Sequence, residues 1–102
     1  MEIKAVLKID LLGDPTAKQS RDFYQELSAR NWQRMASEEE KLLVVYRNLI
    51  SYEEALETIK KELSEAAVVS GITRYGTLVH FMESNMVVFF CGKSGEREKP
   101  AS

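Results

Sequence analysis

Two aspartates in the segment KIDLLGDPTAKQSRD (residues 8–22) have the positions that best suit carboxylate chemistry. Asp10 ends an alternating apolar run, and Asp14 stands directly before Pro15. A carboxylate at the end of a strand can hold a divalent cation, because hard cations prefer oxygen ligands. A carboxylate beside a proline can instead cap a helix by accepting from the free amides of its first turn. We therefore interpret Asp14 as a helix N-cap and Asp10 as the one candidate for a catalytic or metal-binding carboxylate.

Other catalytic motifs are absent from the sequence. It contains no glycine-rich phosphate loop, no metalloprotease helix, no paired zinc-binding cysteines and no nucleophile elbow. The single histidine, His80, falls in the middle of a predicted strand and is expected to have a structural role. The single cysteine, Cys91, cannot form an internal disulfide and is expected to be a small buried apolar group. The sequence therefore favours a protein without catalytic activity.

The composition is that of a globular domain. The chain has 102 residues, of which 44% are hydrophobic and 29% are charged, so one domain with its own core is expected. A net charge of −2 gives no general attraction to nucleic acid or to an anionic membrane. The sequence has no apolar stretch of about 18 residues, the length of a membrane span. Its first ten residues alternate, unlike the apolar segment of a signal peptide, so we expect a cytoplasmic protein.

The elements that position Asp10 are a strand and the helix after it. Residues 2–12 alternate between apolar and polar side chains, which is typical of a sheet covered on one face. A helix is expected from Pro15 to about Arg30, with Asn31 as a left-handed terminator. Two strands, 32–36 and 41–47, are expected to follow around a polar turn at 37–40.

The second half of the chain repeats the pattern of a helix followed by a strand. Ser51 and Glu54 form a predicted capping box, and Gly71 is expected to end the helix. Strands are predicted at 72–82 and 86–91. We assign residues 1–91 to a single domain and expect the polar segment 92–102 to be a disordered tail.

This order of elements predicts an α+β fold. Two β-α-β units joined by a hairpin form a ferredoxin-like β-α-β-β-α-β plait, to which the chain adds a C-terminal strand. Both helices are then expected on one face of an antiparallel sheet, which agrees with the alternation in residues 2–12.

The element order, with Asp10 at the end of the first strand, resembles the small ferredoxin-like plait nucleases. These include the CRISPR-adaptation small subunit and certain toxin–antitoxin endoribonucleases. The likeness covers roughly residues 1–82 in element order and Asp10 in motif; the arginine-rich second-strand signature of the adaptation subunit is not present in NWQRMASEEE. The resemblance implies a metal-dependent endoribonuclease in which Asp10 helps to hold Mg²⁺ or Mn²⁺ between two protomers.

Two other surfaces are candidates for binding. Lys4 and Lys8 share the open face of the predicted sheet, where Arg34 is a third candidate for contacts with nucleic acid. The segment 86–91 is apolar on both sides, so one side of this strand needs a cover. A homodimer formed through the last hairpin is the simplest cover. The expected contact residues are Tyr75, Val79, Phe81, Met86, Val88, Phe89 and Phe90.

From these patterns we expect a small binding or regulatory module that needs no cofactor and acts as a homodimer through protein–protein contacts. A ribonuclease centred on Asp10, with Mg²⁺ or Mn²⁺ as its cofactor, is the alternative. A plait that binds nucleic acid on its open face is a further alternative. No membrane association is expected.

Overall fold

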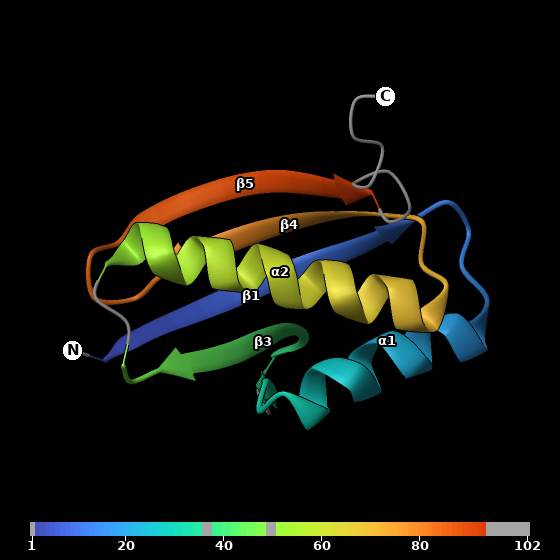
Figure 1. Cartoon of the computed structure of the whole chain (residues 1–102), viewed down its shortest axis with the longest axis horizontal. Coiled ribbons are helices and arrows are strands. Elements are labelled where there is room, and N and C mark those ends of the chain that lie inside the picture. Colours follow the sequence, from blue (N-terminus) through green and yellow to red (C-terminus); the bar gives the residue numbers. More distant parts are fainter. Residues whose placement is uncertain (1, 36–37, 49–50, 94–102) are drawn as a thin grey trace.

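The computed structural model describes residues 2–35, 38–48 and 51–93 of the chain. Within these residues two helices and five strands follow one another as β-α-β-β-α-β-β (Figure 1). None of the described helices is long and apolar enough to cross a membrane. The strands are β1 (Ile3–Leu12), β2 (Gln33–Met35), β3 (Glu38–Tyr46), β4 (Arg74–Phe81) and β5 (Met86–Lys93), and the helices are α1 (Ala17–Ala29) and α2 (Tyr52–Ser70).

The described strands form one antiparallel sheet in the order β2-β3-β1-β4-β5. Strand β1 lies in the middle, and the hairpin of β4 and β5 adds β5 at one edge. Helices α1 and α2 lie side by side on the same face of this sheet (Figure 1). The predicted α+β class, with two helices on one face of an antiparallel sheet, is confirmed for the described residues.

The core lies between this helix-covered face and the two helices. The alternation in β1 is confirmed, since Ile3, Ala5 and Leu7 are fully buried while the residues between them are not. Phe23 and Leu27 of α1 are buried against the same layer. The buried apolar side chains that α2 and β4 contribute are Ala55, Ile59, Leu63, Ala66, Ala67, Tyr75, Val79 and Phe81.

The start of α1 differs from the prediction. Thr16 is the N-cap: its hydroxyl accepts from the Gln19 amide, and the Gln19 side chain accepts from the Thr16 amide in return. The prediction that Asp14 caps the helix is therefore wrong. Gly13 and Asp14 both adopt positive φ angles (80° and 53°), and this turn delays the helix by two residues. Asparagine and aspartate are the non-glycine residues that best tolerate this conformation.

The predicted terminators of both helices and the predicted N-cap of α2, Ser51, are confirmed. Asn31 follows α1 with a φ of 72°, as expected of a left-handed terminator. The Ser51 hydroxyl accepts from the Glu54 amide at the start of α2. Gly71, with a φ of 83°, ends α2 and donates its amide to the Ala67 carbonyl.

A polar network joins α2 to the first half of the chain. Trp32 Nε1 donates to Glu62 Oε1 at 2.7 Å, and the Tyr46 hydroxyl donates to the same oxygen at 3.0 Å. Burial, together with the Glu62 carboxylate, raises the pKa of the Tyr46 hydroxyl. Tyr46 therefore points toward the helical layer, and Glu62 links α2 to β3 and to the residue that precedes β2.

Two element boundaries also differ from the prediction. β5 continues through Gly92 and Lys93, which were assigned to a polar tail, and β3 begins at Glu38 inside the predicted turn. Residues 94–102, and positions 36 and 37 of the turn, lie outside the described residues. Gly92 fits in β5 because the Tyr75 ring lies against the place where a Cβ would stand.

Candidate functional site

The sheet face opposite the helices, which we call the open face, carries a cluster of cations. The register places Lys8 beside Lys41 on one side and Leu78 on the other, and it places Phe89 beside Leu78, so these residues share one face. Counting the described strand side chains of the open face, five are cationic and one, Asp10, is a carboxylate. The cations are Lys4, Lys8, Lys41, Arg74 and Lys93.

The part of the open face formed by β4 and the edge strand β5 is apolar. Phe89 is 65% exposed, Val87 56% and Leu78 42%, although such side chains are usually buried. A hollow of about 340 Å³ lies beside them, lined by Val6, Lys8, Lys41, Leu78, His80 and Val87. His80 is exposed and its Nε2 lies 3.2 Å from Asn85 Oδ1 in the β4–β5 turn. The open face therefore combines exposed apolar side chains on β4 and β5 with cations on β1 and β3 and at one end of β4 and β5.

The helical layer has the opposite charge. Helices α1 and α2 contain seven acidic and four basic residues. The helices are therefore net acidic and the described strand side chains of the open face net basic, although Arg30 and Arg34 lie on the helical side and Lys4 Nζ lies 3.9 Å from a Glu2 carboxylate oxygen. Such a division gives the open face a field that favours acidic partners.

Three of the predicted interface residues lie elsewhere. Tyr75, Val79 and Phe81 are buried beneath the helices, so they belong to the core and cannot contact a partner. Side chains of β4 alternate between the two faces of the sheet: these three point to the helix-covered face, and Leu78 and His80 point to the open face.

The predicted contact residues of β5 divide between the two faces. Val88 and Phe90 are partly buried on the helix-covered side, where Lys60 Nζ lies 5.3 Å from the Phe90 ring centroid. Met86 and Phe89 are exposed, as an interface would require. Cys91 is also exposed, so the prediction that its thiol is buried is wrong.

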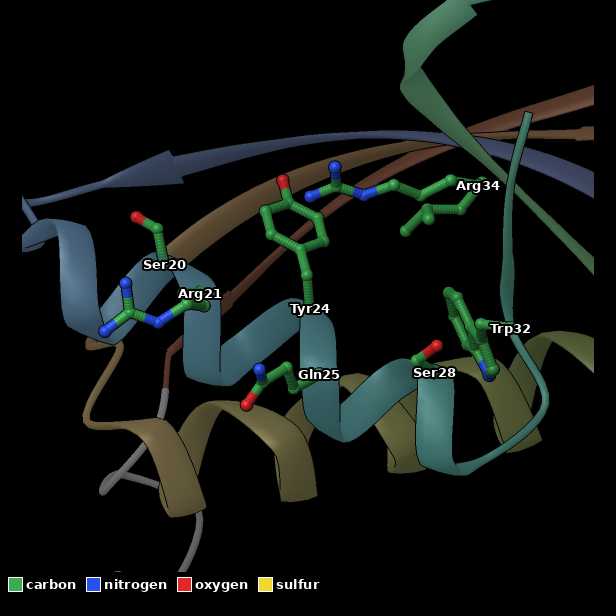
Figure 2. Close-up of a pocket in the computed structure, with 8 residues that line it drawn as sticks. Ser20, Arg21, Tyr24, Gln25, Ser28, Trp32 and Arg34 are labelled. Atoms are coloured by element: carbon green, nitrogen blue, oxygen red, sulfur yellow. The ribbon is translucent and has the colours of Figure 1, made fainter. Parts of the chain in front are cut away.

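Arg34 does not join the lysines of the open face. Strand β2 pairs Arg34 with the buried Leu42, which places Arg34 on the helix-covered side of the sheet. There Arg34 Cζ lies 5.1 Å from the centroid of the Tyr24 ring of α1. Figure 2 shows Arg34 reaching across this ring, in a cleft of about 360 Å³ that is also lined by Ser28 and Trp32.

Asp10 is exposed near the end of β1 and lines a second cleft with Ser20, Tyr24 and Arg34. The β1–β3 register ends at Lys8, whereas the β1–β4 register continues to Leu12. The cleft has a volume of about 480 Å³. Among the described residues no group of three or more histidine, cysteine, aspartate or glutamate side chains could hold a metal ion. Metal binding by Asp10 therefore stays a prediction.

Comparisons of the chain with protein-family models, with curated proteins and with solved structures give no match. The function must accordingly be inferred from the chemistry of the open face and of the two clefts. The open face indicates one kind of ligand more clearly than the clefts do. The two clefts are lined by mixed polar side chains and contain a single carboxylate, Asp10.

Proposed function

We propose that the chain is a ferredoxin-like plait that serves as a non-catalytic binding module, and that its open face docks an acidic partner protein. The strand order β2-β3-β1-β4 with both helices on one face supports the plait assignment. The observation that carries the function is the exposed apolar patch, which we define as Leu78, Val87 and Phe89, with cations on its β1 side and at one end of β4 and β5.

An apolar centre with a charged rim is the usual anatomy of a protein–protein interface. Exposed apolar patches rimmed by polar residues mark binding sites in soluble proteins. On the open face the cations lie to one side of the patch and at one end of it, so a partner with carboxylates beside its apolar side chains fits it best.

Single-stranded nucleic acid fits the same face less well. Proteins that bind single strands stack the bases on several aromatic side chains. Phe89 is the one aromatic ring among the described open-face residues apart from the His80 imidazole, and the neighbouring side chains are aliphatic. The open face therefore offers cations for phosphates but few platforms for bases.

Parallel selections from a random peptide library and a random oligonucleotide pool test this proposal. We expect the peptide selection to enrich sequences in which Asp or Glu alternates with Leu or Phe. Binding of an enriched peptide should weaken at least about tenfold in Phe89→Ser, which removes an apolar anchor, and should weaken with rising salt.

Val69→Ser is the matched control. Val69 on α2 is 65% exposed, as is Phe89, but it lies on the helical side. Its replacement should leave peptide binding unchanged. Enriched peptides that bind Phe89→Ser as tightly as the wild type would overturn the proposal. Enrichment from the oligonucleotide pool alone would also overturn it and make nucleic acid the ligand.

A further inference from the structure

The two edges of the sheet differ in how well they are protected. Strand β2 has three residues, exposes Gln33 and Arg34, and has a register shift after Arg34. Strand β5 has eight residues and a regular register along its whole length. Natural sheets protect their edges with short, bulged or charged strands, because a long apolar edge invites pairing with another chain. By this criterion β2 is protected and β5 is not.

The direction of the backbone groups in β5 follows from one hydrogen bond. The Met82 amide donates to the Lys4 carbonyl at 3.0 Å, so even-numbered residues of β1 and β4 turn their backbone groups toward each other. The odd-numbered residues of β4 then face β5, where the register pairs them with even-numbered residues. The amides and carbonyls of Val87, Phe89 and Cys91 therefore point outward from the edge.

We propose that β5 pairs antiparallel with β5 of a second copy of the chain, around a twofold axis at Phe89. Phe89 then lies opposite the partner's Phe89, and Val87 opposite the partner's Cys91. The outward-facing groups of Val87, Phe89 and Cys91 exchange backbone hydrogen bonds with the same groups of the second copy. The two five-stranded sheets become one continuous sheet.

The sequence of β5 is self-complementary in this register. On the open face Val87 meets Cys91 and Phe89 meets Phe89, and on the other face Val88 meets Phe90. Every such cross-strand pair is apolar, and aromatic pairs are among the most stabilising in sheets. Lys93 lies opposite Asn85 of the turn, so no like charges face each other. If the twofold axis lay at Phe90 instead, Lys93 would lie opposite the apolar Val87 of the second copy.

The arrangement of charges argues against the other self-association, in which two open faces stack on each other. That contact brings the cations of both copies together, and like charges repel. Pairing at the β5 edge keeps Lys4, Lys8 and Lys41 on strands β1 and β3, away from the axis. It also places the apolar patches of the two copies side by side.

A cysteine placed at position 87 tests both the pairing and its register. Residues opposite each other in a hydrogen-bonded antiparallel pair have Cα atoms about 5.5 Å apart, within the range of a disulfide. We expect Val87→Cys to form a covalent dimer under mild oxidation through Cys91 of the second copy. Val87→Cys combined with Cys91→Ser is the matched control and should stay uncrosslinked.

An internal disulfide cannot mimic this result. Positions 87 and 91 lie on one strand, about 13 Å apart along it, and a disulfide requires Cα atoms within about 7 Å. If Val87→Cys fails to cross-link, or cross-links equally well without Cys91, the proposed register is wrong.

Sedimentation velocity tests the association in the unmodified protein. We expect the wild type to sediment with twice the chain mass of 11.7 kDa. Val87→Pro should make the protein sediment as a monomer, with dimerisation weakened at least about a hundredfold. Proline has no amide proton, and the amide of Val87 points outward from the edge, so the substitution removes a hydrogen bond to the second copy and none within the monomer. If circular dichroism shows this variant to be unfolded, Phe89→Lys replaces it. A wild type that remains a monomer at high concentration overturns the proposal. Peptide binding by such a monomer would leave the open-face function intact.

Discussion

Thr77 is a buried hydroxyl in the middle of β4. Its side chain is fully buried, and within the described part of the chain its Oγ1 has no hydrogen-bond partner. A buried polar atom without a partner carries a desolvation cost, whereas an apolar group of the same shape does not.

We therefore expect Thr77→Val to raise the free energy of unfolding by about 1 kcal/mol, measured by urea denaturation. Thr58→Val is the control. The Thr58 hydroxyl donates to the Glu54 carbonyl at 2.9 Å, so its removal should not raise the free energy of unfolding. A destabilised Thr77→Val protein would show that the hydroxyl has a partner that the structure does not reveal.

Burial raises the pKa of two tyrosines, Tyr46 and Tyr75, and Tyr46 also has a carboxylate partner, Glu62. The pKa of Tyr46 is raised in the folded state, first by burial and then by Glu62, so the folded protein holds this proton more tightly than the unfolded chain does. The resulting stability is fully present below the unfolded pKa of about 10. It is lost as the pH rises further, because the unfolded chain then releases the proton first.

We expect the midpoint of urea unfolding to fall more steeply above about pH 10 in the wild type than in Tyr46→Phe. Tyr46→Phe should be less stable at neutral pH, since it loses the hydrogen bond to Glu62. Equal slopes in the two proteins above this pH would contradict the assignment.

At the scale of elements, the start of α1 shows what sequence patterns leave open. Both Asp14 and Thr16 are good capping residues, and Pro15 favours Asp14 as the cap. The structure selects Thr16, because Gly13 and Asp14 both take positive φ angles and Gln19 completes the capping box. The capping residues in the sequence predict that a helix starts near here, but the conformation of the preceding turn determines which of them is the N-cap.

We expect Thr16→Ala to lower the free energy of unfolding by about 1 kcal/mol, because it removes the N-cap. Asp14→Gly is the informative control, since glycine adopts the Asp14 conformation readily and should change stability little. Thermal or urea unfolding of the two variants measures both effects. A larger loss in Asp14→Gly than in Thr16→Ala would return the capping role to Asp14.

The strands show a similar division between what periodicity predicts and what it leaves open. The alternation in β1 correctly predicts its buried and exposed faces, because polar residues mark the wet side. Strand β5 is apolar on both sides, so its sequence cannot indicate which face the helices cover. Cys91 was for that reason predicted to be buried, although its parity places it on the open face.

The side chains of the open face were only partly identified from the sequence. Lys4 and Lys8 were found because β1 alternates, but Lys41 and Arg74 join them only through the register of β3 and β4. Arg34 was misplaced because its face depends on the pairing of a short, irregular strand. Pairing β4 with β5 across the turn between them would have predicted from the sequence that Leu78 and Phe89 lie next to each other.

At the scale of the whole molecule, the uncovered sheet face explains the composition of the last two strands. A two-layer fold buries one face of its sheet and leaves the other to water. Here that face retains exposed valine, leucine and phenylalanine on β4 and β5, with cations on the neighbouring strands, and the helices carry more acidic than basic residues. This arrangement is consistent with a molecule that presents a docking surface on one side.

Mapping of the contact by NMR tests the docking claim most directly. Isotope-labelled protein is titrated at low salt with an acidic peptide in which Glu alternates with Leu, and the same peptide with Lys in place of Glu is the control. We expect amide shifts at Lys8, Leu78, Val87 and Phe89 with the acidic peptide alone, and unchanged signals from α2. Shifts confined to the cleft of Tyr24 and Arg34, or no shifts with either peptide, would contradict it.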